Sequence, residues 1–358
     1  MKKFTVDHLN QEHFSQIIPN AVILILYIVI GFLGNTAVLF VYTKDMKNVF
    51  SSGRLFIPFL ALSDLVTLLF NGFVEFQTEL QTFKATTDGL VFCKFKMFIG
   101  IVLVIISGCL YLAIAVHRYL LICRPHLTFP SRSQKLFILI VSGLFVFGIS
   151  VPKFIFSGFA KVIITSKKTS NQTVGAYLCG NDERFENTLG SNIYNVLLIV
   201  NSCIWNFILA ILYIYVGKQI YKRGNHIKSN TYVKDDRIYT STGTRSIEIV
   251  ENQGPKPMLV KQITMRSIKT FIINNRLSWM FIIMTLLNII CYTPKLVLDV
   301  QHSMDRYFFL NKDDSTFLIL SIADNLYLLN NAINPFLYGF FDREFKNRFT
   351  KRLCFKCK

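Results

Sequence analysis

The feature that most constrains this chain is a nearly uninterrupted apolar stretch over residues 93–125. As a helix that rises about 1.5 Å per residue, the step from Cys93 to Arg118 covers roughly 37 Å, slightly more than the hydrocarbon thickness of a bilayer. Six further apolar blocks occur along the 358 residues, of which 52% are apolar. Because lipid cannot satisfy free backbone groups, each block is predicted to cross as a helix. The sequence therefore predicts an all-α membrane protein, a bundle of seven transmembrane helices.

The distribution of charge predicts the orientation of the bundle. Residues 218–276 hold twelve Lys or Arg against four acids, and residues 341–358 hold seven against two. Basic loops stay in the cytoplasm, so the C-terminus is predicted inside and the N-terminus outside. The sequon at Asn171 then falls in an outer loop and predicts glycosylation there. The net charge of +18 would suggest nucleic acid in a soluble protein, but these blocks are too long for a globular core, so membrane lipids are the predicted partner and nucleic acid is not.

The predicted organisation has three parts. They are an extracellular N-terminus (1–18), the seven-helix domain (19–340) with a long basic cytoplasmic loop (218–276), and a helix with the cytoplasmic tail (341–358). The predicted spans cover about residues 19–42, 55–76, 93–125, 136–159, 193–216, 280–300 and 317–340. The long loop is expected to be disordered between helical extensions. Phe341, Phe345 and Phe349 share one helical face, which predicts a short amphipathic helix on the inner leaflet.

Two pairs of cysteines differ in the chemistry they predict. Cys93 and Cys179 are the two that the topology places outside, where an oxidising compartment should join them. Two free thiols are the alternative. Cys354 and Cys357 lie in a basic tail beside the membrane, which is typical of S-palmitoylation, with plain reduced thiols as the alternative.

Polar residues within the spans predict function because burying them in lipid is costly. Asp64, Ser107, Asn330 and Asn334 lie in spans two, three and seven, near mid-membrane. One carboxylate ringed by hydroxyl and amide oxygens is a ligand set for a hard cation, here a sodium ion. A hydrogen-bonded polar knot is the alternative.

Two prolines within the last two spans predict kinks. Pro294 and Pro335 each remove a backbone hydrogen bond from a helix. Kinks allow a helix to change direction cheaply, although they can also be static. Together with the polar cluster, they favour a bundle that moves.

Several motifs follow one another in the order of the predicted spans. They are Gly34-Asn35, then Leu60, Ala61 and Asp64, then Cys93 with Cys179, His117-Arg118-Tyr119 with Ile122 and Pro125, Cys291-Tyr292-Thr293-Pro294, and Asn334-Pro335-Phe336-Leu337-Tyr338. This pattern resembles the rhodopsin-like G-protein-coupled receptors over about residues 20–353, as a divergent member most like peptide receptors. The resemblance implies a plasma-membrane receptor without catalytic activity that binds a heterotrimeric G protein, arrestin and receptor kinases.

The resemblance also implies roles for individual residues. The implied activation switch comprises His117, Arg118, Tyr119, Ile122, Pro125, Tyr292, Pro294, Asn334, Pro335 and Tyr338. Arg118 resembles the arginine that meets the G-protein C-terminus once span six swings outward, and Tyr338 the tyrosine that turns inward to support it. Tyr213 or Tyr215 is the implied tyrosine of span five. Family members hold an allosteric sodium ion at the positions of Asp64, Ser107, Asn330 and Asn334; no other cofactor is expected.

One departure from the family pattern concerns the neighbour of Arg118. His117 stands where an acid normally pairs with the arginine. We therefore expect basal signalling that is raised or depends on pH, because a protonated histidine would repel Arg118. Tyr292 also replaces the usual tryptophan below the ligand pocket.

The expected ligand is a peptide with basic character. Gly100 stands where amine receptors resemble one another in carrying an aspartate, and span seven holds no lysine for a retinal Schiff base. The expected ligand-binding residues are Glu75, Gln77, Lys96, Gly100, Asp299, His302 and Asp324. The three carboxylates suit an Arg-containing peptide. Lys96 and Lys153 also permit an acidic lipid, another small molecule or a peptide terminus, and solvated rim charges without a ligand role are the plain alternative.

Two other classes of membrane protein fit the sequence less well. A transporter or channel usually shows a repeat that relates its halves, and none is found. An intramembrane enzyme needs a nucleophile with a base or metal ligands at mid-depth, and no such pattern is found.

Overall fold

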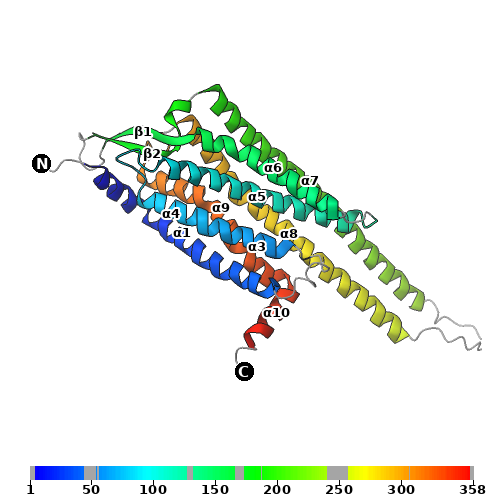
Figure 1. Cartoon of the computed structure of the whole chain (residues 1–358). Helices are drawn as coiled ribbons and strands as arrows, with labels where there is room; N and C mark the ends of the chain where they lie inside the picture. Colours follow the sequence, from blue (N-terminus) through cyan, green and yellow to red (C-terminus); the bar gives the residue numbers. More distant parts are fainter. Residues whose placement is uncertain are drawn as a thin grey trace, which may run out of the picture.

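The computed structural model describes residues 5–43, 54, 56–126, 132–165, 173–186, 188–239, 257–305 and 307–354. Its long helices lie side by side in one bundle (Figure 1). The helices are α1 (Val6–Thr43), α3 (Phe56–Thr67), α4 (Phe73–Leu80), α5 (Leu90–Cys123), α6 (Arg132–Phe156), α7 (Leu189–Tyr239), α8 (Pro257–Met304), α9 (Asp314–Phe341) and α10 (Arg343–Cys354). A π-helical turn, Leu68–Gly72, joins α3 to α4, and the three pieces form the second span.

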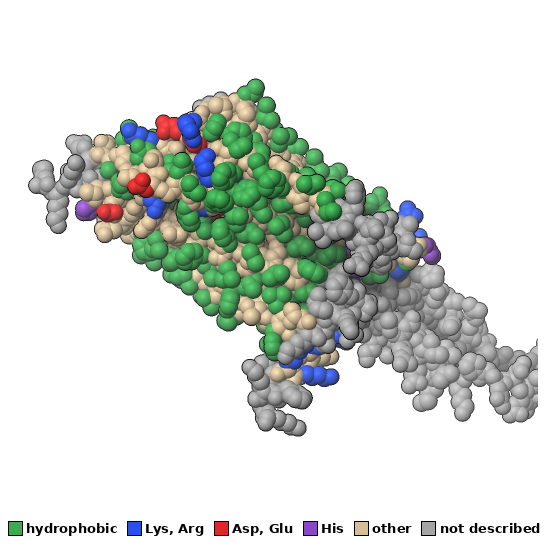
Figure 2. Space-filling model, in the orientation of Figure 1, with side chains coloured by type: hydrophobic (Ala, Val, Ile, Leu, Met, Phe, Trp, Pro, Cys, Tyr) green, Lys and Arg blue, Asp and Glu red, His purple; other side chains and the backbone are tan. Residues whose placement is uncertain are grey.

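The surface of the bundle is apolar, as contact with lipid requires. Figure 2 shows hydrophobic side chains over the middle of the bundle and charged side chains toward its ends. Phe73, Phe147 and Ile290 are 60%, 61% and 61% exposed, which water would penalise and hydrocarbon would not. Within the described residues, six helices are long and apolar enough to cross a membrane, and the remaining apolar helix, Ile140–Phe156, is shorter. The predicted seven-helix membrane bundle is thus confirmed.

Helix boundaries differ from the predicted ones where helices leave the apolar zone. Helix α1 begins at Val6, inside the segment predicted to be an N-terminal tail. Helices α7 and α8 extend to Tyr239 and from Pro257, where the prediction has helical extensions of the spans, and the part of the long loop between them lies outside the described residues. A hydropathy pattern reports only the lipid-facing part of a helix, whereas a formed helix grows past it at little cost.

An antiparallel β-hairpin lies at one end of the bundle, which we call the hairpin end, and the all-α prediction missed it. Strand β1 (Ser157–Thr165) pairs with β2 (Thr173–Asn181), and Phe159 stands opposite Cys179. Lys84 adds a further bridge to Tyr177 of β2. This segment is rich in β-branched residues, which favour strands once water can solvate the outer edges.

The N-terminal part of α1 packs onto this end of the bundle. Leu9, Phe83, Val162 and Ala176 form a buried apolar cluster between α1, the loop after α4 and both strands. The Asn10 side chain donates to the Phe83 carbonyl at 2.9 Å and accepts from the Phe83 N–H at 2.9 Å. The hairpin end is therefore a packed surface to which the first helix contributes.

At the opposite end, which we call the α10 end, α10 leaves the bundle in a new direction (Figure 1). Phe345 stacks on Tyr42 of α1 at 6.0 Å between ring centroids and on Phe349 at 5.8 Å. Phe341, predicted to share this face, instead ends α9. The helix break falls at Asp342, which is buried with a backbone in the extended region.

Candidate functional site

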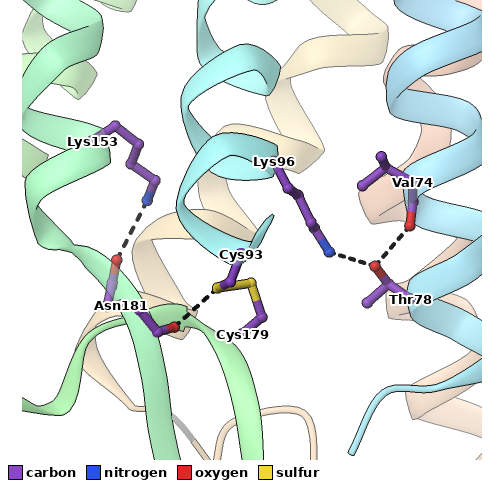
Figure 3. Close-up of a disulfide and its surroundings, with 8 residues drawn as sticks. Val74, Thr78, Cys93, Lys96, Lys153, Cys179 and Asn181 are labelled. Carbon is purple, nitrogen blue, oxygen red and sulfur yellow. Dashed lines mark hydrogen bonds between the residues drawn. A yellow bond between two sulfur atoms is a disulfide. The ribbon is translucent and has the colours of Figure 1, made fainter. Parts of the chain in front are cut away.

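The hairpin is anchored to the bundle by a disulfide. Cys93, near the start of α5, is bonded to Cys179 of β2, with their Cα atoms 5.8 Å apart. This confirms the predicted pairing. Figure 3 shows β2 held against the end of α5, with Lys96 and Lys153 on opposite sides of the bridge. The disulfide therefore holds β2 in place across the polar residues at this end of the bundle.

Two of the carboxylates predicted to bind a ligand are occupied by a lysine that sequence reasoning missed. Lys295 of α8 lies 2.8 Å from Asp324 of α9 and 3.4 Å from Asp299, one turn further along α8. The Lys295 side chain is 26% exposed and the Asp324 side chain 21% exposed, so this pair is only partly solvated. Lys295 stands four residues before Asp299, a spacing that places both side chains on one helix face, and this spacing was the available signal.

The other predicted ligand-binding residues divide between the two sides of the disulfide. Lys96 of α5 donates to the Thr78 hydroxyl of α4 (Figure 3), on the helix that also carries half-buried Glu75. His302 lies near β2, with its Nε2 3.8 Å from where a Cβ on Gly180 would stand. Gln77 is exposed on α4. Lys96 thus contacts α4, the helix of Glu75, whereas His302 belongs to the β2 side.

Gly100 leaves room for a neighbouring polar side chain. A Cβ at this position of α5 would stand 3.6 Å from Oδ1 of Asn71, which belongs to the π-helical turn and is buried. The turn moves Asn71 into the bundle next to α5. Gly100 therefore contributes space beside an amide, rather than the charge an amine ligand would need.

A second polar cluster lies deep in the bundle around Asp64. Asn334 donates to Oδ2 of Asp64 at 2.7 Å, and Ser63 is 3.1 Å from Ser107 between hydroxyl oxygens. Among the described residues, Oδ1 of Asp64 and Oδ1 of Asn334 are buried without a hydrogen-bond partner. Buried polar atoms are normally satisfied, so these two oxygens suit a small hard cation. The residues present therefore fit a sodium ion.

The amide of Asn330 points to other partners than the ones predicted. Its Nδ2 donates to the Tyr111 hydroxyl at 3.2 Å and to Oδ1 of Asn288 at 3.2 Å. Tyr111 in turn accepts from Asn334 at 3.2 Å. Asn330 therefore belongs to a hydrogen-bonded chain that leads to Asp64 through Tyr111, which sequence reasoning missed because a tyrosine in an apolar run carries no distinct pattern.

The arginine of the implied switch lies in the α10-end half of the bundle. Arg118 is 3% exposed, and its guanidinium carbon is 4.5 Å from the ring centroid of Phe281 on α8. The neighbouring His117 packs edge-on against Phe56 of α3, with ring centroids 5.3 Å apart. An aromatic face over a guanidinium is a favourable cation–π contact. Helix α8 therefore covers Arg118 in this structure.

Several other residues of the switch line the same region. Tyr213 and Tyr338 are buried in its apolar cluster, whereas Tyr215 is 56% exposed and meets Tyr119 edge-on. This favours Tyr213 as the inward tyrosine of the fifth span. Ile122 accepts a hydrogen bond from Arg223 of α7 at its carbonyl, at 2.8 Å.

The two kink prolines lie inside helices, as predicted. Pro294 is in α8 and Pro335 is in α9. Pro335 packs on α1 at Gly34, where a Cβ would stand 2.8 Å from the proline ring. Glycine is therefore required at that point for the two helices to approach. Pro125 follows the end of α5 and is exposed.

Buried Asp342 ties α10 to the bundle. One carboxylate oxygen of Asp342 accepts from the Tyr42 hydroxyl at 2.7 Å and from Nε of Arg54 at 2.8 Å. Arg54 also pairs with Glu344 at 2.6 Å. Burial lowers the pKa of Arg54, but the hydrogen bond and the charge of Asp342 outweigh it and hold that pKa above its ordinary value.

We expect Asp342→Ala to lower the stability of the protein by about 3–5 kcal/mol, because it leaves the partly buried Arg54 without its main partner. Thermal unfolding of the purified chain measures the loss. Tyr42→Phe is the milder companion, since it removes one hydrogen bond and should cost about 1 kcal/mol. Equal unfolding midpoints for Asp342→Ala and the unsubstituted chain would contradict this role.

The predicted modification sites remain predictions. Asn171 and Cys357 lie outside the described residues. Cys354 is the last residue of α10, and its side chain also lies outside the description.

A helical membrane bundle with a disulfide-anchored hairpin at one end and a buried arginine toward the other defines a seven-transmembrane receptor. The sequence matches the family described as 7 transmembrane receptor (rhodopsin family) over residues 34–338. The chain belongs to this family, whose members couple to heterotrimeric G proteins and are not enzymes. It is accordingly a multi-pass membrane protein.

Individual relatives agree with this assignment and differ in what they sense. The chain is 30% identical to melanopsin of Rattus norvegicus over 152 residues, which cover 42% of this chain and 31% of melanopsin. It is 32% identical to a GQ-coupled rhodopsin of Mizuhopecten yessoensis over 128 residues, 35% of this chain and 25% of that protein. The neuropeptide S receptor of Homo sapiens is 25% identical over 312 residues, 86% of this chain and 72% of the receptor. The opsin matches thus span a third or less of those proteins.

Proposed function

We propose that this chain is a plasma-membrane receptor that binds an extracellular peptide with basic character and activates a heterotrimeric G protein. The observation that carries this proposal is a group of charged side chains beneath the disulfide-anchored hairpin, which we call the charged layer. Its members are Glu75, Lys96, Lys153, Lys295, Asp299 and Asp324. The likeness to the neuropeptide S receptor, which covers 86% of this chain, supports a peptide ligand. In this proposal the hairpin end faces outward, and the basic residues of 218–276 and 341–358 lie in the cytoplasm.

The charged layer leaves one carboxylate available to a cationic group. Asp299 and Asp324 are already paired with Lys295, and Glu79 accepts a hydrogen bond from Asn20 at 2.9 Å. Glu75 is half-buried, and no ion pair to it is found within the described residues. A ligand guanidinium at Glu75 would gain charge-assisted hydrogen bonds without first separating a salt bridge. Glu75 is therefore the proposed anchor for the basic group.

The experiment is a peptide-library screen on cells that express this chain with a promiscuous G protein and a calcium readout. Basic peptides should give responses that Glu75→Gln weakens at least 10-fold, about 1.4 kcal/mol. Phe73→Leu, at a 60% exposed position of the same helix, is the control and should respond like the unsubstituted chain. Responses to lipids or acidic molecules alone would agree with a receptor but would overturn the proposal that its ligand is a basic peptide.

A light receptor is the second candidate, because melanopsins are among the relatives. Retinal binding would require a lysine amine free to form a Schiff base, and no lysine occurs in α9, Asp314–Phe341. Lys295 lies on α8 and is engaged by two carboxylates. We expect the purified chain to form no visible absorption band with retinal. A band that survives removal of free retinal and is lost in Lys295→Met would contradict the peptide proposal and establish a chromophore.

We also propose that Asp64, Ser107 and Asn334 hold an allosteric sodium ion, with Asn330 in the surrounding hydrogen-bonded chain. Sodium should then raise the unfolding midpoint of the purified chain relative to choline at equal ionic strength. The stabilisation is about 1.4 kcal/mol at ten times the dissociation constant. We expect Asp64→Asn to abolish the sodium effect, because the substitution removes the charge and keeps the shape. Equal effects of sodium and choline on the unsubstituted chain would favour a hydrogen-bonded polar knot.

A further inference from the structure

One lysine of the charged layer has no carboxylate of its own. Lys153 lies near the hairpin end of α6, and its Nζ is 3.4 Å from Oδ1 of Asn181 on β2 (Figure 3). No carboxylate is found within ion-pairing distance of it in the described part of the chain, in contrast to Lys295. A partly buried ammonium with a single long hydrogen bond is under-satisfied.

The carboxylates of Asp182 and Asp299 are held by other cations. Asp182, which follows Asn181, is held by Arg184 at 2.7 Å, and this hydrogen bond keeps the pKa of Asp182 below its ordinary value. Asp299, which interacts electrostatically with Lys153, is paired with Lys295 and 60% exposed. Neither provides Lys153 with a direct partner.

Two groups near Lys153 retain polar atoms without a partner in the part of the chain that the structure describes. Asn181 accepts from Lys153 through Oδ1, so its Nδ2 remains available to donate. His302 of α8 approaches β2 at Gly180, and its buried Nδ1 has no hydrogen-bond partner among the described residues. The paired ammonium and amide N–H, with an imidazole beside the neighbouring residue of β2, match a carboxylate, which accepts several hydrogen bonds.

We propose that Lys153 and Asn181 form a subsite for a carboxylate of the extracellular ligand, the free C-terminus of the peptide. The subsite lies across the Cys93–Cys179 bridge from Lys96 and α4 (Figure 3). A peptide that places a basic side chain at Glu75 and its terminal carboxylate at Lys153 would satisfy both sides of the charged layer. This inference rests on the proposed peptide receptor and adds which end of the peptide is recognised.

Two measurements test the subsite. In cells, a basic peptide library with free C-termini is compared with the same library amidated, and with oleate as a carboxylate that is not a peptide. In the purified full chain, the unfolding midpoint is measured with N-acetylphenylalanine and with its amide at millimolar concentration. The second measurement needs no signalling, so it reports on the subsite even if no library activates the receptor.

The free acids should give the higher potency in cells and the larger rise in the unfolding midpoint. We expect the amidated library to be at least 10-fold less potent, and N-acetylphenylalanine to raise the midpoint where its amide does not. Lys153→Gln should remove both differences, and Lys153→Arg should keep them. Asn181→Asp is the second variant, because it can fold with a new ion pair to Lys153 and should exclude the carboxylate.

Three results would overturn the subsite. They are equal potency of acid and amide libraries, equal midpoints with N-acetylphenylalanine and its amide, and an acid preference that persists in Lys153→Gln. A response to oleate alone, lost in Lys153→Gln, would keep the anion site but assign it to a fatty acid and overturn the peptide terminus. If no library activates the receptor but N-acetylphenylalanine still raises the midpoint where its amide does not, the proposed function would be contradicted and the subsite would stand.

Discussion

The double variant Cys93→Ser, Cys179→Ser is expected to lose most of its cell-surface expression and its response to ligand. The bridge joins residues 86 positions apart, and removing a native disulfide costs about 2–4 kcal/mol because the unfolded chain regains conformational freedom. That is a large share of the about 5–15 kcal/mol that stabilises a typical protein. Strand β2 would also lose its attachment to α5, and with it the position of Asn181 over the charged layer. Surface labelling of intact cells and thermal unfolding of the purified chain measure the two effects.

The chain offers a matched control for this experiment. Cys203 is an exposed, free cysteine of α7, so Cys203→Ser changes the same atoms without opening a bridge. We expect this variant to match the unsubstituted chain in surface expression and unfolding midpoint. A double variant that also matched it would show that the packing of Leu9, Phe83 and the strands holds the hairpin by itself.

The apolar spans and the disulfide could be predicted because each rests on a local or topological signal. A bilayer requires about twenty apolar residues in a row, and a sequence shows such a run directly. Once the spans alternate sides, Cys93 and Cys179 are the cysteines left outside. The hairpin and the extension of α1 carry no such requirement, because they lie where water can satisfy the backbone. These elements depend on tertiary contacts, such as those between Asn10 and Phe83.

The candidate site could be predicted in composition but not in pairing. The depth of a residue along a helix follows from its position, so Asp64, Ser107 and Asn334 could be placed together. Which neighbour a side chain contacts depends on helix rotation and tilt, which a sequence does not fix. For this reason the sequence predicts Asn330 in the same cation site as Asp64, although the Asn330 amide donates to Tyr111 and Asn288. For the same reason the sequence predicts three carboxylates for a basic ligand although Lys295 pairs with two of them.

Arg118→Ala is expected to abolish ligand-stimulated guanine-nucleotide exchange while the protein still reaches the cell surface. In the proposed mechanism, Arg118 meets the G protein after α8 has moved. Removing a buried, charge-assisted contact costs about 2–5 kcal/mol, which corresponds to a loss of roughly 30-fold or more. Nucleotide exchange in membranes, normalised to surface expression, measures the change. Arg343→Ala, an exposed arginine of α10, is the control and should retain exchange.

The contact between Arg118 and Phe281 determines which way a second variant should act. Phe281 covers the guanidinium at 4.5 Å only while α8 is packed against α5. Phe281→Leu keeps an apolar side chain and removes the aromatic face, so it weakens the closed arrangement by about 0.5–2 kcal/mol. Such a loss shifts a two-state equilibrium toward the open arrangement by roughly 2- to 30-fold. We therefore expect Phe281→Leu to raise basal exchange, and to lose that rise when Arg118→Ala is added. Raised exchange in the double variant would show that α8 movement activates the G protein without Arg118.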